Sequence, residues 1–357
     1  MSESSKVHPV KSPPEDGGRK AAFNGVKKFL HRFIEGERNL QVTALLIVGL
    51  IILNTLFSFS FSVSRKPVLN RLLGQKLAGV AAPAPSTVPG SPAPAPEIDT
   101  EAVLPAAGVS LPVEWEDLGK QMVMAGVIDN AKMEALYSQR GPAPDGAGRG
   151  GMSEMMKKVL KENNNEKIAI NPQTSGELLN LFWALGLANK NEILDKGEMW
   201  DKQFGGDAGK FASTGGWTLA SGNVMDHYSK HPFIKLTKDQ QAMVDKVSKG
   251  IFRPCCGNST HFPDCNHGMA MLGLLQLMAS RGVSEADMYK YALAVNAYWF
   301  PDTYLTIASY LKTQGRDYAQ TSPQELLSAQ YSSAQGYKQI LSQVQPVQGK
   351  SSGGCGV

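Results

Sequence analysis

A run of 22 residues without a single charge, residues 42–63, constrains this chain more than any other feature. At a rise of about 1.5 Å per residue, a helix of this length crosses a hydrocarbon layer of about 30 Å. Arg65 and Lys66 follow it directly, where a cleaved signal peptide would have small residues. We therefore predict one transmembrane helix at 42–63 that stays in the protein as a signal anchor.

The basic residues around this segment predict its orientation. Within 20 residues of the segment each side carries four Lys and Arg. Over 41 residues the N-terminal side carries eight and the C-terminal side four. Because positive charge is retained on the cytoplasmic side, we expect a cytoplasmic, largely disordered tail and an extracytoplasmic domain. Apolar residues at helical spacing within 23–35, with basic residues between them, favour an interfacial helix on anionic headgroups. A solvated tail is the alternative for this segment.

The sequence after the anchor divides into three parts. Residues 64–111 include an Ala/Pro-rich run, which cannot enter a sheet or a helix interior and predicts an extended stalk. Residues 112–345 are long enough for one core, and a glycine-rich loop at 139–151 can separate off a small helical subdomain. Residues 346–357 are expected to be a flexible Gly/Ser/Cys tail.

The fold class predicted for residues 112–345 is mainly α, with a few short extended segments. Capping signals such as Thr237 with Gln240, and Ser284 with Asp287, mark helix starts. Helices are also predicted at 114–126, 130–138, 153–162 and 175–187, and extended segments at 210–221 and 233–236. The helix after His267 is apolar on nearly all sides and should be the buried centre of the domain, with Gly273 among the small residues that allow close packing.

The distribution of charge argues against a nucleic-acid partner. The net charge of +4 lies entirely in residues 1–111, because residues 112–357 hold 24 basic and 24 acidic residues. A neutral domain lacks the positive surface that a phosphate backbone requires. The expected partners are therefore the lipid bilayer and an unidentified protein of the cell envelope.

A cluster of cysteine and histidine at 255–267 is the strongest candidate site. It contains Cys255, Cys256, His261, Asp264, Cys265 and His267. Thiolates and imidazoles suit Zn, Cu or Fe, so the cysteines and histidines are predicted metal ligands, with Asp264 as a secondary candidate. Their spacing departs from that of the common zinc motifs. A sulfur of Cys255 or Cys256 should lie within about 4 Å of Cys265 if they share a metal or a bond.

Two other interpretations of the cluster remain open. An extracytoplasmic domain meets an oxidising compartment, so a disulfide from Cys255 or Cys256 to Cys265 would staple the loop. Alternatively, Cys265 at the start of a helix can perform thiol redox chemistry. Secondary ligand candidates are His227 and His231, four residues apart, and Cys355 in the C-terminal tail.

The sequence thus predicts a membrane-anchored helical domain whose Cys/His cluster binds a transition metal or performs thiol redox chemistry. The alternative is a structural or interaction domain of the cell envelope, without enzymatic activity, whose loop is stapled by a disulfide. The chain has no Walker, dinucleotide, H-E-x-x-H or G-x-S-x-G motif, so no reaction is assigned.

Overall fold

The computed structural model describes residues 96–139 and 150–348. The predicted interfacial helix at 23–35, the anchor at 42–63, most of the stalk and the tail from residue 349 lie outside these residues. Within the two described ranges, no helix combines the length and the apolar character that a membrane span requires.

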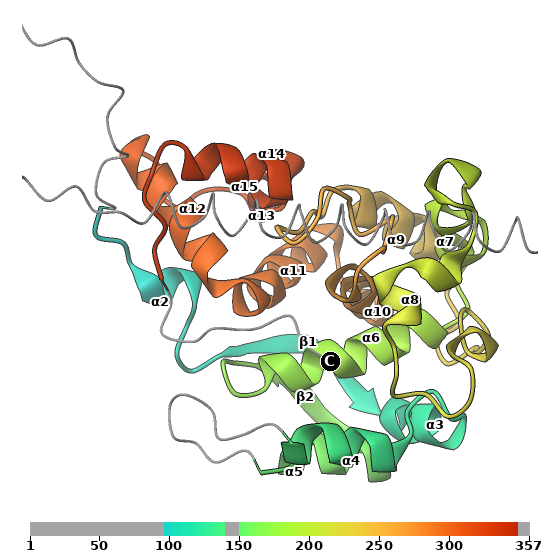
Figure 1. Ribbon diagram of the computed structural model, residues 1–357. Coiled ribbons are helices and arrows are strands. Elements are labelled where there is room, and N and C mark those ends of the chain that lie inside the picture. The colour runs from blue at the N-terminus through green and yellow to red at the C-terminus, as the bar shows by residue number, and fades with distance from the viewer. Residues whose placement is uncertain (1–95, 140–149, 349–357) are drawn as a thin grey trace, which may run out of the picture. The chain divides into compact units, whose positions relative to one another are not determined.

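The described residues are mainly helical, as predicted. Figure 1 shows their arrangement. The α-helices are α2 (Thr100–Val103), α3 (Leu118–Met124), α4 (Asn130–Gln139), α5 (Glu154–Lys161), α6 (Ser175–Ala188), α7 (Glu192–Lys196), α8 (Ala212–Gly215), α9 (Lys238–Lys249), α10 (Asn266–Ser280), α11 (Glu285–Trp299), α12 (Pro301–Thr313), α13 (Pro323–Leu326), α14 (Ala329–Ser332) and α15 (Ala334–Leu341). Four 3-10 turns accompany them: η2 (Glu198–Trp200), η3 (Lys202–Phe204), η4 (Ala208–Lys210) and η5 (Val224–Asp226).

Helices α6 and α10 form the centre of the structure, and they touch through glycine. A Cβ on Gly186 of α6 would lie 2.0 Å from the carbonyl oxygen of Met269, and one on Gly273 of α10 would lie 2.5 Å from the carbonyl oxygen of Phe182. The two backbones are therefore in direct contact, which only glycine permits. Residues 267–279 of α10 are all buried, which confirms the predicted central helix.

A two-stranded antiparallel sheet packs beside this pair and was not predicted. Strand β1 (Val109–Glu116) pairs with β2 (Asn164–Ile170), with Val109 opposite Ile170. Alternate residues of β1 point inward, and its Trp115 ring lies 4.8 Å from that of Phe182 in α6. Figure 1 shows α3, α4 and α5 below the sheet and α11 to α15 above α6. The predicted helix at 114–126 is thus wrong in its first residues, and ordered structure begins before residue 112.

The capping signals located the later helices correctly. Thr237 and Gln240 form the capping box of α9, and the Ser284 hydroxyl accepts from the amide of Asp287 at the start of α11. The predicted extended segments at 210–221 and 233–236 are wrong, because 210–221 holds the end of η4, α8 and turns, and 233–236 begins with two bends and forms no strand. One apolar core joins residues on both sides of the 139–151 segment, for example Met133 and Met156 with Leu274.

Candidate metal centre

The cysteine-bearing loop, residues 250–265, connects α9 to α10 and is fixed to the surrounding fold at several points. The amide of Thr260 donates to the carbonyl of Ile251 (2.8 Å), and Phe252 forms a bridge with Ser259. The amide of Phe252 donates to Leu327, near the C-terminal helices (2.8 Å). These bonds fold the loop back on itself, so that residue 255 returns to the start of α10.

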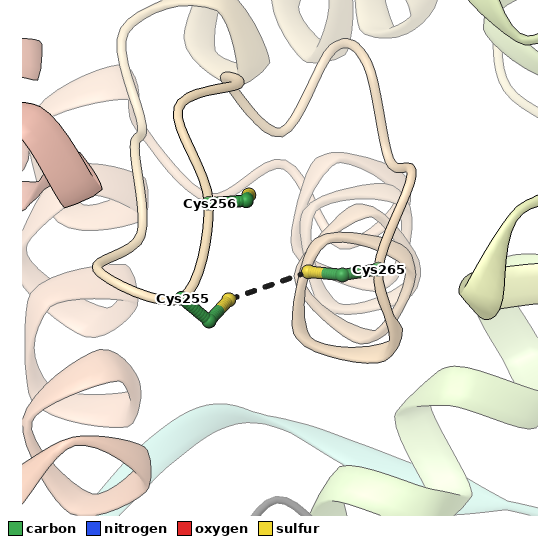
Figure 2. Close-up of side chains that lie close together, drawn as sticks. All are labelled: Cys255, Cys256 and Cys265. Carbon is green, nitrogen blue, oxygen red and sulfur yellow. Dashed lines mark hydrogen bonds between the residues drawn. The ribbon is translucent and has the colours of Figure 1, made fainter. Parts of the chain in front are cut away.

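Three sulfurs meet where the loop closes (Figure 2). The Sγ atoms of Cys255, Cys256 and Cys265 all lie within 4.8 Å of one another. The Sγ–Sγ distance from Cys255 to Cys265 is 3.4 Å, which confirms the predicted proximity of these two residues. All three are free thiols, and the distance exceeds the length of a disulfide bond, about 2.05 Å. The predicted disulfide is therefore not formed in this structure.

A buried arginine, which the sequence did not single out, organises the cluster from behind. Arg253 is only 1% exposed. Its Nε donates to Cys265 Sγ (3.0 Å), and Nη2 donates to Asp264 Oδ1 (2.6 Å). Two further bonds reach the carbonyls of Asn258 and Phe262, both at 3.0 Å. A buried cation is tolerated only when its charge is paired and its donors are hydrogen-bonded, and here four acceptors take four of the five N–H donors.

Glycine at position 268 makes room for this cation. A Cβ on Gly268 would lie 2.4 Å from Cζ of Arg253, so any larger residue in the first turn of α10 would displace the guanidinium. The sequence carries a weak sign of this arrangement: Arg253 is the only charged residue between Lys249 and Asp264. What the sequence could not show is that Arg253 is buried.

The three thiols differ in pKa, and only Cys265 has a lowered one. Hydrogen bonds from Cys255 and Cys256, together with the charge of Arg253, hold the pKa of Cys265 well below its usual range. Cys265 also occupies the N-cap position of α10, where the helix dipole favours negative charge. The pKa of Cys255 is raised by its hydrogen bonds to the other two thiols. For Cys256 the contact with Cys255 lowers the pKa, but the contact with Cys265 and burial raise it to about 12.

His261 does not join the three sulfurs, contrary to the predicted ligand set. Its Nδ1 lies 2.9 Å from Glu198 Oε2, and its Nε2 lies 2.8 Å from Asp245 Oδ1. Burial would raise the pKa of Asp245, but hydrogen bonds from Lys249 and His261 lower it. The imidazole therefore connects the cysteine-bearing loop to η2 and α9, and it lines a cavity of about 640 Å³ beside α7 and α9.

His267 is close to the cluster but is packed against aromatic rings. It is 2% exposed, and its ring centroid lies 4.4 Å from that of Phe300 and 5.7 Å from that of Trp299. Its Nδ1 has no hydrogen-bond partner among the described residues. His267 is not part of the three-residue ligand group, so its predicted role as a direct ligand is not realised in this geometry.

The secondary candidates have other partners. Asp264 accepts from Arg253 and Asn258, and its Oδ1 lies 3.7 Å from Cys256 Sγ. His227 and His231 bind each other, with Nδ1 and Nε2 separated by 3.1 Å, and His227 Nε2 lies 2.9 Å from the carbonyl of Ser221. Cys355 lies outside the described residues.

Comparisons with known proteins assign no relative to this chain. No protein-family model matches it, and no curated protein and no solved structure is significantly similar to it.

Proposed function

We propose that the cysteine-bearing loop binds a transition-metal ion through Cys255, Cys256 and Cys265. The observation that carries the proposal is that three thiol sulfurs lie within 4.8 Å of one another. Zinc–thiolate bonds of about 2.3 Å at tetrahedral angles place their sulfurs about 3.8 Å apart. Small side-chain rotations therefore suffice to bring all three sulfurs onto one ion. Zn, Cu and Fe all accept such ligands.

The charge balance of the loop supports this function. Binding releases the protons of Cys255 and Cys256, since a thiol coordinates as thiolate. Three thiolates with a divalent ion carry a net charge of −1, and the guanidinium of Arg253 already contacts one of them. Arg253 can thus donate to a metal-bound sulfur without moving, as outer-shell hydrogen-bond donors do in other metal sites. Three protein ligands leave the fourth position of a tetrahedral ion for an exchangeable ligand.

Metal analysis of the purified full-length chain, prepared under reducing conditions, tests this function. We expect about one equivalent of metal, and a loss of affinity of at least about tenfold in each of Cys255→Ser, Cys256→Ser and Cys265→Ser. Ser259→Ala serves as a matched control in the same loop, and its affinity should equal that of the parent. Absence of bound metal, or undiminished affinity in Cys265→Ser, would refute the proposal.

We further propose that residues 42–63 anchor this domain in a membrane, with the domain on the extracytoplasmic side. An oxidising compartment there favours the disulfide, so the metal binds only while the three thiols are reduced. The support is the uncharged run itself and the eight basic residues that precede it. The protein should therefore resist extraction by alkaline carbonate, and protease added to intact cells should degrade the domain. Release into the carbonate supernatant would exclude an anchor, and protection from the protease would reverse the orientation.

A further inference from the structure

We propose that Cys255 and Cys265 form a redox gate on the metal site: their oxidation to a disulfide removes two of three ligands and releases the metal. This inference rests on the proposed metal-binding function and adds its regulation. Two observations support it: the three thiols can share one metal ion, and two of them, Cys255 and Cys265, are close enough to form a bond.

Three cysteines allow three disulfide pairings, and the geometry favours the one between Cys255 and Cys265. The sulfurs of Cys255 and Cys265 are 3.4 Å apart, so closing to a bond length of about 2.05 Å requires little movement. Cys255 and Cys256 are adjacent, and a trans peptide holds their Cα atoms about 3.8 Å apart, which is shorter than the usual disulfide range of about 4.4–6.8 Å. The thiol of Cys256 faces Asp264 Oδ1 at 3.7 Å instead.

Cys255 and Cys265 differ in solvent exposure and in hydrogen bonding, and this difference favours thiol–disulfide exchange that begins at Cys255. Cys255 is exposed, so an oxidant reaches it first, whereas Cys265 is partly covered and is held by Arg253. The loop keeps its shape independently of these sulfurs, because Arg253 also binds the carbonyls of Asn258 and Phe262. Oxidation should therefore change the site and leave the fold intact.

The oxidant that we infer is a low-molecular-weight disulfide such as oxidised glutathione. In the metal-loaded chain Cys255 has already released its proton, because a thiol coordinates as thiolate. This thiolate attacks one sulfur of the oxidised glutathione, forms a mixed disulfide and expels one glutathione thiolate. The Cys265 thiolate then attacks the Cys255 sulfur, closes the intramolecular bond and expels the second glutathione thiolate. Two electrons pass from the cysteines to glutathione disulfide, and the metal leaves in its original oxidation state because Cys256 is its only remaining ligand among the three.

The test uses the full-length chain loaded with Zn²⁺ and treated with oxidised glutathione. Released zinc is measured with a chromophoric chelator, and the cross-link is located by mass spectrometry of peptides. We expect one zinc ion released for each Cys255–Cys265 disulfide formed, and recovery of zinc binding after reduction. Cys355→Ser should behave in the same way, since the proposed gate requires only Cys255 and Cys265.

The Cys256→Ser variant tests the redox gate independently of the metal site. Cys256→Ser retains both gate cysteines and should form the same disulfide, even where its zinc affinity is reduced. Zinc that stays bound after the disulfide has formed, or a disulfide that joins other cysteines, would overturn the gate and leave the metal site intact. Failure of the reduced parent chain to bind zinc would instead refute the proposed function.

Discussion

At the scale of single residues, Arg253 is the most consequential side chain outside the ligands. It is fully buried, and four acceptors surround it, of which Asp264 and Cys265 carry negative charge. Burial would lower the pKa of Arg253, but Cys265 and the other charged neighbours raise it above its ordinary value. Arg253 is therefore a permanent cation inside the cysteine-bearing loop.

Replacing this arginine should be costly. Arg253→Met leaves Asp264 and the Cys265 sulfur without their common partner, and removal of one member of a buried ion pair typically costs about 3–5 kcal/mol of unfolding free energy. Because Asp264 retains partial exposure, we expect about 3 kcal/mol, measured by urea denaturation. The matched control is Arg281→Met, whose ion pair with Glu116 is open to solvent and should contribute less than about 1 kcal/mol. Equal losses in the two variants would contradict a special role for Arg253.

The histidine pair predicts how stability depends on pH. Burial, and then the neighbouring His227, lower the pKa of His231 below the ordinary value of 6.5. The unfolded chain therefore binds a proton more readily than the folded chain, and the stabilising effect is present above about pH 6.5 and is lost as the pH falls toward the lowered pKa. We expect His231→Gln to flatten the decline in melting temperature between pH 7 and pH 5. An unchanged slope would show that this pair does not cause the decline.

At the scale of elements, the contact between α6 and α10 determines where the cysteine-bearing loop ends. Gly186 and Gly273 bring the two backbones together, and α10 carries Cys265 at its N-cap. The position of one ligand therefore depends on glycines in the helix–helix contact, because any separation of the helices would move the start of α10.

Gly273→Ala tests this contact. The added methyl group would meet backbone atoms of α6 that cannot rotate away, and overpacking of this kind costs about 1–3 kcal/mol. Gly176→Ala, near the start of α6, is the matched control: nothing lies within 4 Å of its Cβ, so the substitution should be neutral or stabilise by up to about 1 kcal/mol. Thermal unfolding of both variants gives the comparison, and similar melting temperatures would argue against the close contact.

Local signals in the sequence predicted the helices better than the strands. Caps such as Ser284 at α11 depend on neighbouring residues, which the sequence shows directly. Strand β1 contains Pro112 and begins within the segment that we assigned to the stalk, and β2 has charged residues on its outer face. Both strands exist because they pair with each other, with partners 48 to 61 residues apart in the sequence, and no local pattern encodes that pairing.

At the scale of the whole molecule, the candidate site combines predictable and unpredictable parts. The density of cysteine in one loop predicted that Cys255 and Cys265 would meet. The orientations of the histidines depend on distant residues: His261 turns to Glu198 and Asp245, and His267 packs beneath Trp299 and Phe300. These side-chain orientations follow from tertiary packing. The sequence could therefore identify the two histidines as candidate ligands, but it could not predict which way their imidazoles point.

The most direct test of the central claim is X-ray absorption spectroscopy at the zinc edge of the reduced, Zn²⁺-loaded full-length chain. The proposed centre predicts a first shell with three sulfur atoms at about 2.3 Å, and two sulfurs in the Cys255→Ser variant. A first shell that contains only nitrogen and oxygen, or a spectrum that Cys255→Ser leaves unchanged, would contradict metal binding by these three cysteines.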